Sequence, residues 1–107
     1  MPLKNIFNKN SIEKIIRKGG QINRSPFFVC KYMSSKLNYS QFCIIVSSKV
    51  SKSAVQRNTI KRRIREAIRH NIHLLTEHYC IVLLVKPEIL GASYQKIETE
   101  IKNLFSS

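Results

Sequence analysis

The chain has 107 residues, the length of one domain, and it carries 19 Lys and Arg against 6 acidic residues, for a net charge of +13. Hydrophobic residues make up 43% of it, which excludes a disordered basic tail and is enough for one modest core. All six acids are Glu, so the sequence offers little of the carboxylate clustering that holds the ions of a two-metal nuclease. We therefore expect a single domain over residues 1–107 that binds a polyanion.

The cysteines and the apolar runs indicate the compartment. Cys30, Cys43 and Cys80 are odd in number and none belongs to a C-x-x-C pair, so we expect buried thiols in a reducing environment. The longest apolar run, residues 79–85, is much shorter than the roughly 20 residues that span a bilayer. The expectation is a cytoplasmic protein with no membrane partner, and nucleic acid is the favoured polyanion.

The first half of the chain predicts a short helix followed by two strands. Asn10 and Glu13 have the spacing of a capping box, and Gly19 is a plausible stop, so a helix is expected over residues 10–18. Residues 27–33 and 42–47 have strand composition, and we expect the two strands to pair as a hairpin.

The second half predicts a long helix, a buried strand and a last helix. Ser53 and Gln56 have capping-box spacing at the start of a helix that should reach about His70. Residues 79–85 are continuously apolar, as in a strand buried on both faces, and residues 93–105 have helical periodicity. The predicted order is α-β-β-α-β-α, an α+β sandwich.

The long helix concentrates the positive charge. Residues 49–69 contain eight basic residues and one acid. At 100° per residue, an apolar arc holds Ile60, Ile64, Ala67, Ile68 and Leu75. The adjacent arc, here called the basic face, holds Asn58, Lys61, Arg62, Arg65 and Arg69. Arg57 lies in the first turn, at the edge of the core side of the helix. Arg63 lies outside both arcs, beyond the far edge of the apolar arc. Cations one turn apart repel each other, so this pattern favours a surface that contacts polyphosphate.

These residues carry a family resemblance. The residues that match the pattern A-V-x-R-N-R-x-K-R-x-x-R are Ala54, Val55, Arg57, Asn58, Lys61, Arg62 and Arg65. Thr59 departs from the pattern, because it stands where the pattern has its second Arg. With the order of the elements, this motif resembles the protein subunit of bacterial ribonuclease P. The resemblance implies a fold like the second domain of a small-subunit ribosomal protein, with a left-handed β-α-β crossover.

The resemblance also implies a function, namely to assist a catalytic RNA in removing the 5′ leader of precursor tRNA. The RNA subunit would perform the hydrolysis with Mg²⁺, so no catalytic residue, no metal site and no obligate protein partner is expected in this chain. The residues expected to contact the catalytic RNA are Lys49, Lys52, Arg57, Asn58, Lys61, Arg62, Arg65 and Arg69. The residues expected to line a cleft for the leader are Ile12 and Ile16, where the family often has aromatics, with Phe28, Cys30 and Tyr32. For Phe28 and Tyr32, ordinary packing is an equal alternative.

A metal site, a catalytic pair and two other binding functions have weaker support in the sequence. The histidines and cysteine at His70, His73, His78 and Cys80 fit no common zinc spacing. Glu66 and His70 are four residues apart, but Glu66 is more simply a partner for neighbouring arginines. Two other functions stay open on the sequence: a structural protein that binds ribosomal RNA, and a DNA-binding module that places its basic helix in the major groove.

Overall fold

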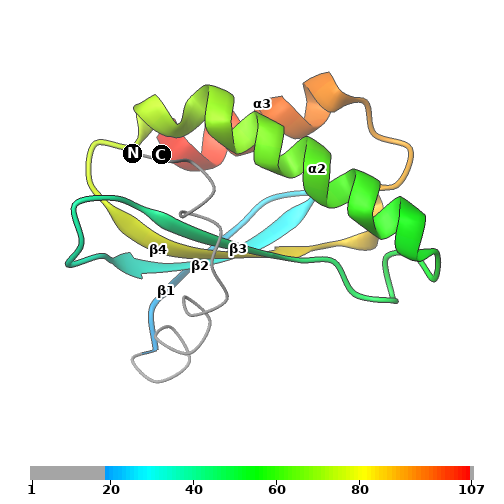
Figure 1. The fold of residues 1–107 in the computed structure, drawn as a ribbon, viewed down its shortest axis with the longest axis horizontal. Helices are drawn as coiled ribbons and strands as arrows, with labels where there is room; N and C mark the ends of the chain where they lie inside the picture. Colours follow the sequence, from blue (N-terminus) through cyan, green and yellow to red (C-terminus); the bar gives the residue numbers. More distant parts are fainter. Residues whose placement is uncertain (1–18, 107) are drawn as a thin grey trace.

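The computed structural model of this chain describes residues 19–106 (Figure 1). Its elements are β1 (Gln21–Arg24), β2 (Phe28–Ser34), β3 (Gln41–Ile45), α2 (Ala54–Asn71), η2 (Ile72–Leu74), β4 (Tyr79–Val85), η3 (Pro87–Ile89) and α3 (Tyr94–Ser106). The helix expected over residues 10–18 lies outside the described residues. The predicted buried strand and the two predicted helices that follow residue 50 are confirmed.

The four strands form one mixed sheet in the order β1-β2-β4-β3. β2 pairs antiparallel with β1 and β4, whereas β3 runs parallel to β4 and is joined to it through α2. The expected hairpin between residues 27–33 and 42–47 is therefore wrong, because β4 lies between those two strands. β4 is apolar along its whole length because it is paired at both edges and its side chains pack into apolar clusters on both faces of the sheet. The handedness of the β3–α2–β4 crossover stays a prediction.

β1 was not expected from the sequence. It is a four-residue edge strand, and its burial pattern is almost entirely exposed. An edge strand of this kind carries no alternation of apolar and polar residues, because neither of its faces is deeply covered. Its register opposite β2 is nevertheless complete, from Gln21 opposite Tyr32 to Arg24 opposite Val29.

Both α2 and α3 cover the same face of the sheet (Figure 1). The core lies between the helices and this face, and its fully buried side chains include Phe28, Phe42, Ile64, Leu83 and Ile101. The predicted apolar arc is confirmed at its four members within α2, namely Ile60, Ile64, Ala67 and Ile68, all of which are buried. Leu75 follows the helix and packs half-buried against the same core.

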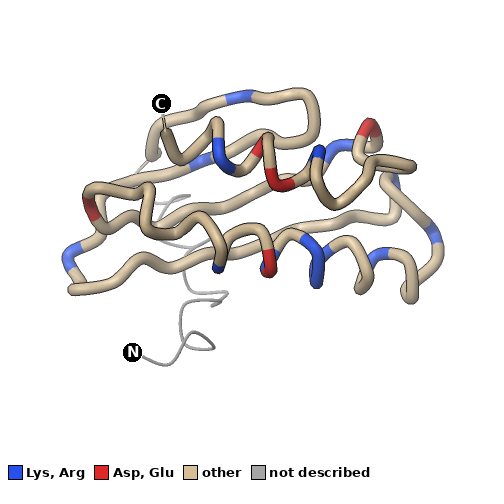
Figure 2. Tube along the Cα trace, turned by 90° about the horizontal axis from the view of Figure 1, so that it is seen from above, with Lys and Arg blue, Asp and Glu red and all other residues tan. Residues whose placement is uncertain are grey.

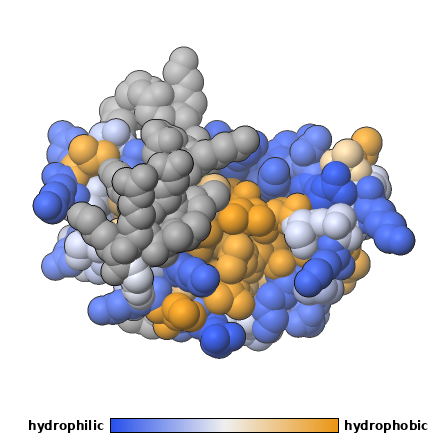
Figure 3. Space-filling model, turned by 90° about the horizontal axis from the view of Figure 1, so that it is seen from below, coloured by the Kyte–Doolittle hydropathy of each residue, from blue (hydrophilic) through white to orange (hydrophobic). Residues whose placement is uncertain are grey.

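The other side of the sheet, here called the far face, carries a smaller apolar cluster. It consists of Cys43, Cys80 and Val82, with Met33, Ile45 and Leu84 packed against them. Figure 3 views the molecule from this side and shows hydrophobic side chains gathered at its middle among hydrophilic ones. All three cysteines are buried thiols that form no disulfide within residues 19–106, as predicted, with Cys30 on the helix side. Among the described residues, no helix has the length and apolar content needed to cross a bilayer.

Candidate nucleic-acid interface

Two serines, Ser51 and Ser53, hold the loop before α2 against the first turn of the helix. The Gln56 backbone N–H donates to Ser53 Oγ at 3.2 Å, as the predicted capping box requires. In a capping box the side chain of Gln56 would also accept the backbone N–H of Ser53. Here Ser51 lies between the two groups: the Ser53 N–H donates to Ser51 Oγ at 3.2 Å, and the Ser51 hydroxyl donates to Gln56 Oε1. The Arg57 guanidinium donates to the Ser51 carbonyl at 2.8 Å. Lys49 and Lys52 are thus carried on a loop that is tied to the helix.

The basic face points away from the core. Asn58, Arg62, Arg65 and Arg69 are exposed and Lys61 is half-buried. Figure 2 shows the Lys and Arg positions recurring along α2. Within residues 19–106, no ion pair neutralises Lys49, Lys52, Lys61 or Arg62; Arg69 contacts Glu66 at 3.4 Å. Lys61 and Arg62 of the basic face, with Lys49 and Lys52 of the loop, therefore keep their positive charge available for an external anion.

The opposite flank of α2 is joined to α3 by polar contacts. His70 Nε2 lies 3.3 Å from Glu66 Oε1, and His70 Nδ1 lies 3.4 Å from Glu98 Oε2. The Tyr94 hydroxyl is 3.1 Å from His70 Nδ1 and donates to Glu98 at 3.3 Å. Partial burial, and then the Glu98 carboxylate, raise the pKa of Tyr94. Glu66 and His70 are therefore parts of a helix–helix contact.

Two of the residues predicted to line a leader cleft are instead in the core. Phe28 is fully buried and Cys30 is 5% exposed, both on the face that the helices cover. For Phe28 the alternative of ordinary packing therefore holds, and the prediction is wrong for Cys30, whose thiol is buried on the helix-covered side. Alternation along β2 showed which residues share a side, but not which side the helices cover. Ile12 and Ile16 lie outside the described residues.

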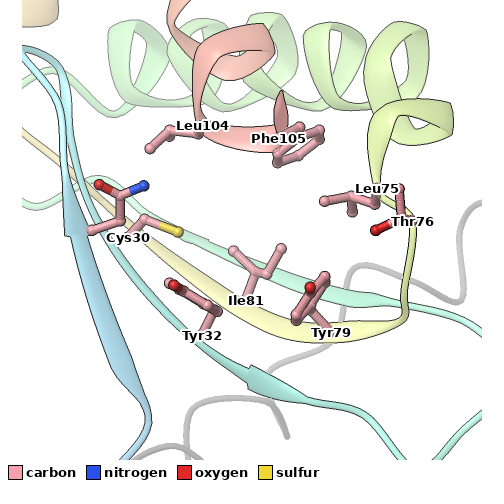
Figure 4. A pocket seen from close by; sticks show the side chains of 9 residues that line it. Cys30, Tyr32, Leu75, Thr76, Tyr79, Ile81, Leu104 and Phe105 are labelled. Carbon is pink, nitrogen blue, oxygen red and sulfur yellow. The ribbon is translucent and has the colours of Figure 1, made fainter. Parts of the chain in front are cut away.

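Tyr32 lies on the same helix-covered side, at the rim of a small pocket beneath the last turn of α3 (Figure 4). The pocket has a volume of about 120 Å³, and Tyr32 meets Tyr79 edge to face, with ring centroids 5.9 Å apart. Cys30 lines the same pocket, and burial raises the pKa of its thiol to about 12. Tyr32 thus packs between the sheet and α3 and does not reach the far face.

The β2 side chains that point to the far face are Val29, Lys31 and Met33, none of which was expected to line the leader cleft. All three are half-buried, and Met33 belongs to the far-face cluster. Side-chain size could not have decided between the two sides, because Phe27 and Phe28 are adjacent and identical and alternation places them on opposite sides of the strand.

No group of three His, Cys, Asp or Glu side chains within residues 19–106 is arranged so that it could hold a metal ion. His73 and His78 are exposed, and Cys80 is buried in the far-face cluster.

The mixed sheet with two helices on one face, and the unneutralised cations of α2, define a small basic protein of the polyanion-binding class. The family model of ribonuclease P matches residues 2–107. The chain belongs to the ribonuclease P protein family, whose members are subunits of the ribonucleoprotein endoribonuclease that processes the 5′ end of tRNA together with an RNA subunit. This match decides against the ribosomal and DNA-binding alternatives.

Relatives and solved structures agree with the family. The chain is 39% identical to the ribonuclease P protein component of Synechocystis over 88% of its own length and 76% of that protein. It is 34% identical to the Clostridioides difficile component, over 90% of its length and 84% of that protein. The structure resembles the RNase P proteins of Thermotoga maritima (TM-score 0.79, 22% identity, 89% and 88% of the two chains) and Staphylococcus aureus (TM-score 0.76, 24% identity, 91% and 88%). At these identities the solved structures support the fold.

Proposed function

We propose that this chain docks on the catalytic RNA of ribonuclease P through the basic face and the loop before it. The observation that carries the proposal is the run of cations along α2 and that loop, of which Lys49, Lys52 and Arg62 are exposed and form no ion pair within residues 19–106. The residues assigned to this contact are Lys49, Lys52, Arg57, Asn58, Lys61, Arg62, Arg65 and Arg69.

The chemistry of the face suits phosphate. The planar guanidinium of Arg62 donates two parallel hydrogen bonds to one phosphate, which a Lys ammonium does not. Arg57 uses one N–H on the Ser51 carbonyl and has further donors, since a guanidinium carries five N–H groups. RNA phosphates between the rows of cations also offset the repulsion that these side chains exert on one another.

The leader of the precursor tRNA is assigned to the far face. Val29, Lys31 and Met33 of β2 place one cation among apolar side chains, beside the far-face cluster. Such a surface suits single-stranded RNA, because the apolar groups contact bases while the ammonium contacts the backbone. Ile12 and Ile16 stay candidates for the same contact. Phe28, Cys30 and Tyr32 are not part of this assignment.

Hydrolysis is assigned to the RNA subunit and its Mg²⁺. Within residues 19–106, no group of three or more His, Cys, Asp or Glu side chains is arranged to hold a metal ion. The contribution of the chain is to bring two RNAs together and to reduce the repulsion between their phosphates. The proposal places this work in the cytoplasm.

A reconstitution tests the proposed function. The purified chain is mixed with a bacterial ribonuclease P RNA and a precursor tRNA at low Mg²⁺, and cleavage at the mature 5′ end is expected only when both subunits are present. If about six phosphates are neutralised, the affinity for the RNA should fall about a thousandfold between 50 and 200 mM monovalent salt. The proposal would be contradicted if the affinity for the RNA hardly changed with salt concentration, or if the rate of cleavage were the same with and without the protein.

A further inference from the structure

Arg63 is the cation of α2 that the basic face does not include. Its side chain is exposed, and it lies on the flank of the helix that faces the turn after β4. No carboxylate within residues 19–106 forms an ion pair with it, although Glu66 is only three positions away, because Glu66 contacts Arg69 and His70. An exposed guanidinium with no internal partner is free to bind an external anion.

Arg63 borders a hollow between α2 and that turn. The hollow has a volume of about 330 Å³ and is lined by Thr59 and Arg63 from the helix, Leu90 and Gly91 from the turn, and Ile97 from α3. This volume is at the small end of the range for ligand pockets, about 300–1,000 Å³. Figure 1 shows the start of α2 and the β4–α3 connection at the same end of the molecule.

The wall opposite Arg63 is apolar and ordered. Leu90 is 43% exposed, although it is a large hydrophobic side chain. The turn that carries it is closed by backbone hydrogen bonds, from Leu90 N–H to the Pro87 carbonyl and from Ala92 N–H to the Ile89 carbonyl, both 3.0 Å long. Gly91 has a φ of +78°, a backbone conformation that glycine adopts at little cost. The hollow thus pairs one cation with an apolar surface at a fixed position.

We propose that this hollow is a second contact for the catalytic RNA, in which Arg63 binds a backbone phosphate and Leu90 contacts the adjoining nucleoside. The inference rests on the proposed function, because the occupant is the same RNA. It adds a contact on the flank of α2 opposite the basic face, so the RNA would meet the helix from both sides.

Thr59 makes the assignment specific to this chain. It lines the same hollow one helical turn before Arg63, and it stands where the family pattern has an arginine. Residues four apart lie on one stripe of a helix. A cation at either position therefore reaches the same hollow, and Arg63 supplies here what an arginine at residue 59 would supply.

The test uses the full chain and the catalytic RNA, with affinities measured as a function of salt. Arg63→Ala should weaken binding about tenfold and lower the slope of log affinity against log salt by about one. The double variant Thr59→Arg with Arg63→Ala should restore both values. Lys36→Ala is the matched control, since it removes an exposed cation from the β2–β3 loop, at the opposite end of β4 from the hollow.

The outcomes separate the two proposals. Wild-type protein that binds the RNA without a steep salt dependence contradicts the proposed function itself. If the wild type binds as expected but Arg63→Ala behaves like Lys36→Ala, the second contact is overturned. The same holds if an arginine at residue 59 fails to rescue binding. Thermal unfolding of each variant should match the wild type, because the side chains of Lys36, Thr59 and Arg63 all lie outside the core.

Discussion

At the scale of single residues, burial decides which side chains are available for chemistry. Cys30 and Tyr32 belong to the same strand side, yet the thiol is almost fully buried whereas the phenol is half-exposed. Charge follows the same division, because the cations of α2 are exposed or half-buried while Ile60, Ile64 and Ile68 fill the core. A residue type that suits RNA is therefore informative only together with the face on which it lies.

The thiol of Cys30 should be nearly inert in the folded protein. Burial raises its pKa from 9.0 to about 12, which lowers the thiolate fraction at pH 8 about a thousandfold. Alkylation by iodoacetamide at pH 8, followed by peptide mass spectrometry, should modify Cys30 slowly in the native chain and rapidly in urea. Equal rates in the two states would contradict the buried position.

The raised pKa also gives the direction of a pH effect. The folded state favours the neutral thiol, so its contribution to the free energy of unfolding is complete below pH 9 and is lost as the pH rises toward 12. Urea midpoints measured between pH 8 and pH 11 should therefore fall.

At the scale of elements, the start of α2 positions the interface. Ser53→Ala removes the oxygen that accepts the Gln56 N–H, and we expect it to lower the free energy of unfolding by about 1 kcal/mol. Ser48→Ala is the control, since Ser48 is exposed in the preceding loop and has no hydrogen bond within the described residues. Urea unfolding followed by circular dichroism measures both, and an equal loss in the two variants would refute the capping role.

The elements with strong periodicity could be predicted from the sequence. α2 was predicted from its cap and from apolar residues such as Ile60 and Ile64, and β4 from its unbroken apolar run. β1 was missed because a short exposed edge strand has no such pattern, and the β2–β3 hairpin was wrong because strand partners are decided by tertiary contacts. The basic face follows from helical spacing alone, whereas the side of β2 that meets the leader depends on where the helices pack.

At the scale of the whole molecule, the sheet separates two surfaces. The helices cover one face. The far face carries the apolar cluster (Figure 3), and Lys31 of β2 is paired with Val82 of that cluster. If the leader lies there, Lys31→Ala should reduce the affinity for a precursor tRNA with a leader several-fold and leave the affinity for mature tRNA unchanged. Binding of the two RNAs to the reconstituted particle measures this difference.

Lys36→Ala again serves as the control for lost charge in that experiment. An equal loss of affinity for precursor and mature tRNA in Lys31→Ala would assign Lys31 to general electrostatic attraction and refute its place beside the leader.

The position of β4 at the centre of the sheet also bears on biosynthesis. A growing chain that has not yet extended past residue 78 can pair β1 only with β2, and an isolated two-stranded hairpin is marginally stable in water. β2 and β3 each wait for a partner 39 or more positions further along the chain, so the contact order is high for so small a protein. The cationic segment that becomes α2 therefore leaves the ribosome before the sheet that will support it can form.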